Sequence, residues 1–261
     1  MFSETVKYNK NKKYKLTKHS FIKFFSKESS ADLKQEADRA IVLSRVIENF
    51  PHLQSVGQKS LVFDRINRLK PVFDIFESKK TRKNYSVLAW TYEVVGYIVA
   101  QLHGKKLLFA DLSPNNIGIV KNKQVYKVYM YDAGKTPLYN YIVEYSSQNR
   151  YLDIASLVFT TFKKQNSVLL DPKELNVRLR LARKFLCSYK RASAKKGQSF
   201  NCLRFYVSLL VIWFNYMFRY PKKIKGLIYA LLTGIIVLLN APVLCISLFL
   251  CRAKVQKKKS K

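Results

Sequence analysis

Apolar and polar positions follow two different periods along the chain, and the change between them separates a strand-rich beginning from a mostly helical remainder. Residues 4–27 mix apolar and basic residues in short runs such as HSFIKFF, a pattern typical of strands with one solvent-facing side. Apolar residues then recur at helical spacing from Ala31, where Ser29 or Ser30 is a suitable helix cap and Pro51 ends the pattern. The beginning of the chain is therefore predicted to be a sheet with one helix.

The remainder of the chain alternates between short strand-like runs and longer helical ones. Residues 60–69 have the length of a strand, and the stretches NIGIV and VYKVYMYD read as a hairpin around the basic turn KNKQ. Helical spacing recurs in three further segments, at residues 86–107, 149–164 and 171–191. This order predicts an α+β protein of two lobes, a small strand-rich lobe over about 1–70 and a helical lobe over about 71–200.

The last part of the chain is apolar and basic. Residues 226–251 contain no charged side chain, and a helix of that length, at about 1.5 Å per residue, can cross a bilayer core of about 30 Å. Basic residues flank the segment on both sides, and Pro242 lies just past its middle. A kinked span and a re-entrant or monotopic hairpin both remain open, whereas the uncharged length disfavours a buried helix pair. With the shorter apolar run 202–218, residues 201–261 are predicted to form a membrane-associating tail.

The charge of the chain indicates a polyanionic partner. Lys and Arg number 48 against 16 Asp and Glu, a formal net charge of +32, and Glu174 is the last acidic residue. No nucleic-acid recognition module is apparent, so anionic membrane lipids are the expected partner and nucleic acid is not. The first residues lack the apolar core of a secretory signal, so the bulk of the protein is expected to lie in the cytoplasm.

Two short motifs carry the candidate chemistry, ADLSPNNIGIV and, after the predicted hairpin strand, YDAG. Phosphoryl transfer needs a carboxylate to orient the acceptor hydroxyl and oxygen ligands for a metal ion. Asp111 is a candidate base, and Asn116 and Asp132 are oxygen ligands of the kind that Mg²⁺ prefers. Gly134 is expected to let the backbone turn sharply beside Asp132.

These motifs resemble the catalytic loop D-x-x-x-x-N and the metal-binding D-F-G of the protein-kinase-like superfamily. ADLSPNNIGIV followed by YDAGK is most similar to the bacterial lipopolysaccharide core heptose kinases and related sugar kinases, over roughly residues 15–165. The resemblance implies a two-lobed kinase-like fold that uses ATP and Mg²⁺, with Asp111 as catalytic base and with Asn116 and Asp132 as metal ligands. Asp153 resembles the aspartate that braces the catalytic loop, although an exposed charge on an amphipathic helix is the alternative.

The resemblance extends more weakly into the first lobe. FIKFF is similar to the strand whose lysine holds the nucleotide phosphates, which implies Lys23, with Glu36 as its helix partner, unless the two form an ordinary surface pair. SLVFDRINR, with Asp64, is similar to the hinge strand that contacts adenine. Two features depart from the family: Phe109 stands where many relatives have His, and no glycine precedes Lys23 to form a glycine-rich cover over the phosphates.

Together these features predict an ATP- and Mg²⁺-dependent phosphotransferase. Its acceptor is expected to be a sugar hydroxyl of a membrane glycolipid, the lipopolysaccharide core, at the cytoplasmic face of the inner membrane, with residues 226–251 as the anchor. The missing glycine-rich cover motivates an alternative, a kinase-like membrane scaffold with weak or no activity. A membrane-bound protein kinase is a further alternative, disfavoured by the short segment 135–148 after the second motif. His19, His52 and His103 are given no catalytic role.

Overall fold

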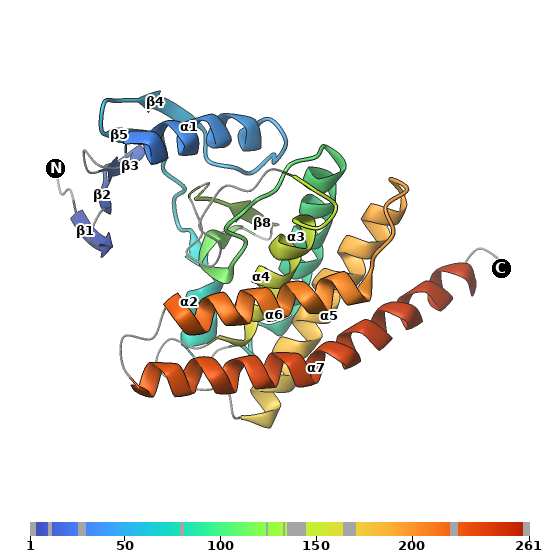
Figure 1. Cartoon of the computed structure of the whole chain (residues 1–261). Coiled ribbons are helices and arrows are strands. Elements are labelled where there is room, and N and C mark those ends of the chain that lie inside the picture. The colour runs from blue at the N-terminus through green and yellow to red at the C-terminus, as the bar shows by residue number, and fades with distance from the viewer. Residues whose placement is uncertain are drawn as a thin grey trace.

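The structure is a computed structural model that describes residues 4–9, 12–25, 30–78, 81–123, 125–132, 134, 145–163, 171–219 and 224–257. Within these ranges a strand-rich N-terminal part lies beside a larger helical part (Figure 1). The α+β, two-lobed fold predicted from the sequence is confirmed.

The first lobe is an antiparallel sheet of five strands in the order β1-β2-β3-β5-β4, with one helix. Its elements are β1 (Glu4–Asn9), β2 (Lys12–Leu16), β3 (Ser20–Phe25), α1 (Ser30–Ser44), β4 (Leu53–Val56) and β5 (Ser60–Asp64). Strand β3 lies in the middle, where Lys23 pairs with Tyr14 on one side and Leu61 on the other. Buried side chains of the sheet and the helix, such as Phe25 and Ala40, form its core. A rigid central strand therefore carries Lys23.

The second lobe combines a small sheet with helices. The sheet, in the order β6-β7-β8, consists of β6 (Lys70–Pro71), β7 (Ile117–Asn122) and β8 (Val125–Met130). The helices are α2 (Val72–Glu77), α3 (Tyr85–Gly104), α4 (Arg150–Phe162), α5 (Pro172–Ala194), α6 (Cys202–Arg219) and α7 (Ile224–Lys257), with a short 3₁₀ turn, η2 (Pro114–Asn116). Helix α3 packs closely on α5, because a Cβ at Gly96 would lie 2.5 Å from the carbonyl oxygen of Phe185. A 2.8 Å hydrogen bond between the buried hydroxyls of Tyr92 and Thr161 joins α3 to α4.

Most elements agree with the sequence predictions, and the differences have local causes. The first helix ends at Ser44 rather than before Pro51, because the chain breaks into single turns there, closed by hydrogen bonds such as that from Phe50 N to Ile47 O (3.1 Å). The buried side chains of Ile47 and Phe50 still reach the core, which explains why the apolar spacing continues beyond the helix. Three short elements, β4, β6 and α2, were not predicted, because they are too short to show a period.

The hairpin interpretation of the tail is wrong, because α7 runs as one helix through Pro242. A proline inside a helix removes one backbone donor, and its ring crowds the carbonyl four residues earlier, which bends the helix. Figure 1 shows that the helix changes direction along its length, as expected for a helix with an internal proline. By length and composition alone, Leu227–Leu248, with a mean hydropathy of 2.3, is able to cross a membrane.

Candidate active site

A cavity of about 680 Å³ is lined by residues from both lobes. All the site residues assigned from the sequence line it, namely Lys23, Glu36, Asp64, Asp111, Asn116 and Asp132. These residues come from β3, α1, β5, the loop before β7 and the loop after β8, so the fold gathers groups that are far apart in the chain.

The loop after α3 holds Asp111 and Asn116 together. Pro114 begins the short turn η2, where its missing N–H costs nothing, and Asn116 N donates to Ser113 O (3.0 Å). The Asn116 side-chain Nδ2 donates to Asp111 O (2.9 Å) and to Asp111 Oδ2 (2.8 Å). Since the amide nitrogen is bonded to Asp111, the amide oxygen is the atom of Asn116 that can coordinate a cation.

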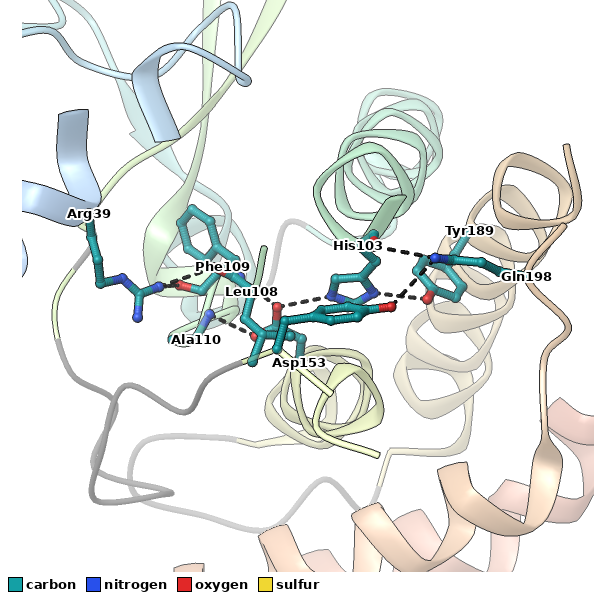
Figure 2. Close-up of polar contacts among 9 residues, drawn as sticks. Arg39, His103, Leu108, Phe109, Ala110, Asp153, Tyr189 and Gln198 are labelled. Carbon is teal, nitrogen blue, oxygen red and sulfur yellow. Dashed lines mark hydrogen bonds and ion pairs between the residues drawn. The ribbon is translucent and has the colours of Figure 1, made fainter. Parts of the chain in front are cut away.

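A buried carboxylate holds the backbone just before Asp111 (Figure 2). Asp153 on α4 accepts a hydrogen bond from Phe109 N through Oδ2 (2.6 Å) and one from Ala110 N through Oδ1 (2.8 Å). Ala110 has a φ of 70°, a left-handed conformation that is costly for a residue with a side chain, so the loop needs such a restraint. Asp153 is 0% exposed, which overturns the alternative of an exposed charge.

His103 completes this network and was not identified from the sequence. Its Nε2 lies 3.2 Å from Asp153 Oδ2 and its Nδ1 lies 2.9 Å from the Tyr189 hydroxyl (Figure 2). Burial raises the pKa of Tyr189, which keeps it a neutral hydroxyl. Phe109 is fully buried, and the imidazole that contacts Asp153 is that of His103, at the end of α3.

A second residue that the sequence did not reveal connects the lobes. Arg39 on α1 donates from one nitrogen to Leu108 O (3.2 Å) and to Phe109 O (2.8 Å), as Figure 2 shows. The helix that carries Glu36 is thereby tied to the loop that carries Asp111.

Lys23 forms a buried network with two carboxylates. Its Nζ pairs with Glu36 Oε1 and with Asp132 Oδ1, the latter at 2.7 Å. Burial by itself lowers the pKa of Lys23, but the charges of Asp132 and Glu36 outweigh it and the pKa is raised, so the amine stays protonated. The side chains of Lys23 and Glu36 are 2% and 3% exposed, so they are not an ordinary surface pair.

The turn after β8 differs from its sequence prediction. The left-handed residue is Asp132 itself, with a φ of 65°, rather than Gly134. Gly134 N donates to Asp132 Oδ1 (3.0 Å), and a Cβ on Gly134 would lie 2.8 Å from that oxygen and 3.1 Å from Glu36 Oε2. Glycine is thus required by close approach to the Lys23 network, and the strain is carried by Asp132.

One end of the cavity is apolar and suits a planar base. Tyr14 on β2 stacks on Phe21 at a ring separation of 5.1 Å, and Phe63 lies 6.4 Å from Phe21. Asp64, at the end of β5, accepts a 2.5 Å hydrogen bond from Gln54 through Oδ1. Strand β2 therefore contributes an aromatic side chain, Tyr14, to the cavity, in the lobe whose sequence lacks a glycine-rich loop.

Lys163 lines the cavity and was also not predicted. Its Nζ lies 4.9 Å from the centre of the Tyr216 ring on α6. The buried Arg178 on α5 holds the end of α4 by donating to Thr161 O (2.8 Å) and Lys163 O (3.0 Å). Burial lowers the pKa of Lys163, although the nearby charges of Asp111 and Glu77 oppose the change.

The donor set fits a magnesium ion held partly by a nucleotide. Among the described residues no group of three or more His, Cys, Asp and Glu side chains is placed to hold a metal. Asn116 and Asp132 supply one amide oxygen and one carboxylate to the same cavity. Mg²⁺ is commonly bound by one or two protein oxygens, with phosphate and water completing the shell, so these residues fit it.

Solved structures of other proteins are similar to this chain over most of its length. No protein-family model matches the chain, and a search of curated proteins finds no relative. Among solved structures, APH(2")-IIa in a ternary complex with streptomycin and ATP is 14% identical, with a TM-score of 0.44, and the match covers 89% of this chain and 93% of that chain. Choline kinase from Cryptosporidium parvum Iowa II is 10% identical, with a TM-score of 0.47, and the match covers 99% of this chain and 90% of that chain. A strand-rich lobe and a helical lobe around a shared cavity give the chain a protein-kinase-like fold.

Proposed function

We propose that the protein is an ATP- and Mg²⁺-dependent phosphotransferase with a hydroxyl group as acceptor. One observation carries the proposal: a buried lysine paired with two carboxylates and an Asp–Asn pair line a single cavity. Phosphoryl transfer depends on positioning and on charge stabilisation, and these groups supply both.

Each residue has a role in this scheme. Asn116 and Asp132 would hold Mg²⁺, which neutralises phosphate charge when bound. Lys23 would contact the phosphates of ATP. Asp111 would accept the proton of the acceptor hydroxyl while the hydroxyl oxygen bonds to the γ-phosphorus and the bond between that phosphorus and ADP breaks. Lys163 lines the same cavity as Asp111, and its positive charge would stabilise the phosphoryl group during transfer.

We further propose that the acceptor is a membrane glycolipid, with the lipopolysaccharide core heptose as the specific candidate. The motif ADLSPNNIGIV followed by YDAGK supports this choice, as does the net charge of +32. An already phosphorylated glycan and anionic lipids both attract such a protein. This assignment places the protein at the cytoplasmic face of the inner membrane, with the apolar C-terminal helix as its attachment.

The test is transfer of label from γ-labelled ATP into extracted membrane lipid by the purified full chain. Asp111→Asn is expected to lower the turnover number at least about a hundredfold, because the general base is lost. Binding of Mg·ATP should persist in this variant, since Lys23 and Asp132 remain. Asp38→Asn, on the exposed side of α1, is the matched control and should retain wild-type turnover.

The outcomes separate the alternatives. Wild-type turnover in Asp111→Asn would refute the assignment of the base. Label in protein instead of lipid would favour a protein kinase. A wild-type protein that neither binds Mg·ATP nor transfers phosphate would be the scaffold.

A further inference from the structure

Helix α6 carries an apolar stripe on its solvent side. The exposed apolar side chains recur every three or four residues, so they lie on one face of the helix. They are Leu203, Val207, Val211, Phe214 and Phe218. The end residues are the most exposed, at 71% for Leu203 and 80% for Phe218.

Helix α7 carries a second stripe of the same kind. Its exposed apolar side chains are Leu227, Ile228, Leu231, Leu232, Ile235, Leu239, Val243 and Ile246. Figure 1 shows α6 and α7 side by side along the helical lobe, away from the N-terminal sheet. We call the two stripes together the apolar face. Rows of exposed apolar side chains on two neighbouring helices indicate an interaction site, whereas single exposed apolar residues are ordinary.

The opposite side of α7 is fixed to the lobe along its length. Val237, Ala241 and Leu244 are at most 1% exposed and belong to the same hydrophobic core as Phe205 on α6. Lys190 Nζ donates to Leu248 O (2.8 Å), near the end of the apolar segment.

A tight contact near the start of α7 fixes the other end. Trp213 Nε1 donates to Ala230 O (3.2 Å), and a Cβ on Gly234 would lie 1.9 Å from the indole nitrogen. The segment long enough to span a bilayer is therefore the segment that packs on the protein. A transmembrane orientation would require the release of this packing.

The charge around the apolar face identifies its occupant. No acidic residue follows Glu174, whereas Lys and Arg continue to Lys261 and stand on both sides of the apolar part of α7. Anionic phospholipid headgroups complement such charge, and the acyl region beneath them accepts the exposed Leu, Ile and Phe side chains.

We propose that α6 and α7 lie in the plane of an anionic membrane, with the apolar face at the boundary of headgroups and acyl chains, and that α7 does not cross the bilayer. Tyr216 lines the cavity from α6; it is two residues from Phe214 and from Phe218, and therefore lies on the opposite side of the helix from the apolar face. The cavity therefore lies within one helix diameter, about 10 Å, of the membrane surface. The idea that this closeness brings a membrane acceptor to the cavity rests on the proposed function, whereas the docking of α6 and α7 on a membrane does not.

The first test is flotation of the full chain with vesicles of phosphatidylcholine, with or without phosphatidylglycerol. Wild-type protein should float with the anionic vesicles. The triple variant Phe214→Gln/Phe218→Gln/Leu239→Gln should lower the partition coefficient at least about tenfold, since three large apolar groups no longer enter the membrane. Val125→Gln, which changes an equally exposed apolar residue of the β7–β8 hairpin, should float like the wild type.

The second test measures depth. A fluorescent amino acid at Leu227, Leu239 or Ile246 is quenched by lipids that carry a quencher at a known depth. In-plane helices give the same shallow depth at the three sites, whereas a span places Leu239 deeper than the other two and would overturn the proposal. Failure of wild type to bind anionic vesicles would also overturn it, and self-association that protects the apolar face would then identify a second copy as the occupant. Stabilisation by Mg·ATP, measured on the same proteins, reports separately on the proposed function.

Discussion

Replacement of Asp153 by Asn tests whether a buried carboxylate holds the loop that carries Asp111. Asp153 accepts hydrogen bonds from the backbone nitrogens of Phe109 (2.6 Å) and Ala110 (2.8 Å), and it contacts His103. Asn has only one acceptor oxygen, so one backbone donor would face an NH₂ group. A buried hydrogen bond to a charged group contributes about 1.5–3 kcal/mol, and a buried donor left unpaired adds to its loss. We expect the free energy of unfolding to fall by about 2–4 kcal/mol out of a total of about 5–15 kcal/mol.

Urea unfolding of the full chain in mild detergent, followed by circular dichroism, measures this change. Turnover should fall with stability, because Ala110 is released from its left-handed conformation next to Asp111. The exposed Asp38→Asn variant controls for the chemical change and should stay within about 0.5 kcal/mol of wild type. A similarly small effect for Asp153→Asn would refute the bracing role.

Three further predictions follow from single contacts. Burial lowers the pKa of Lys163 below the ordinary lysine value of 10.5, so this amine loses its charge at a lower pH than an exposed lysine. Because Arg keeps its charge, Lys163→Arg should move the alkaline limb of the rate–pH profile to higher pH. An unmoved limb would exclude this amine from the reaction. Gly134→Ala places a methyl group against Asp132 and should weaken Mg·ATP binding about tenfold in calorimetry, or about 1.4 kcal/mol, so unchanged affinity would argue against the close approach. Gly234→Leu collides with Trp213 and should lower the free energy of unfolding by about 1–3 kcal/mol, whereas a neutral result would show that α6 and α7 pack differently.

Part of the site was predictable because its chemistry is local in sequence. Asp111 and Asn116 share one loop, and Asp132 ends the adjacent hairpin, so short spacings were enough to predict that they meet. Lys23 and Glu36 were assigned only through the resemblance to the kinase-like family. Their burial and their joint contact with Asp132 depend on the two lobes coming together, which no local pattern shows.

The residues that were missed contribute through long-range contacts. His103 contacts Asp153 from another helix, Arg39 bonds to the loop before Asp111 from the other lobe, and Tyr216 lines the cavity from the apolar tail. None of them stands in a recognisable motif. Pro242 left a kinked helix and a hairpin both open from the sequence, and the structure has one helix through it, because a helix packed along a core tolerates the loss of one hydrogen bond.

The most direct test of the central claim is binding of Mg·ATP by the full chain, measured as a thermal shift with and without Mg²⁺, in wild type and in Asp132→Asn. A ligand that binds the folded state stabilises it by about 2.7 kcal/mol at a concentration a hundred times its Kd. We predict metal-dependent stabilisation of the wild type that is lost in Asp132→Asn, because the proposed function assigns the ion to this carboxylate, which pairs with Lys23. No shift of the wild type at millimolar ATP would contradict the nucleotide site and leave a kinase-like scaffold.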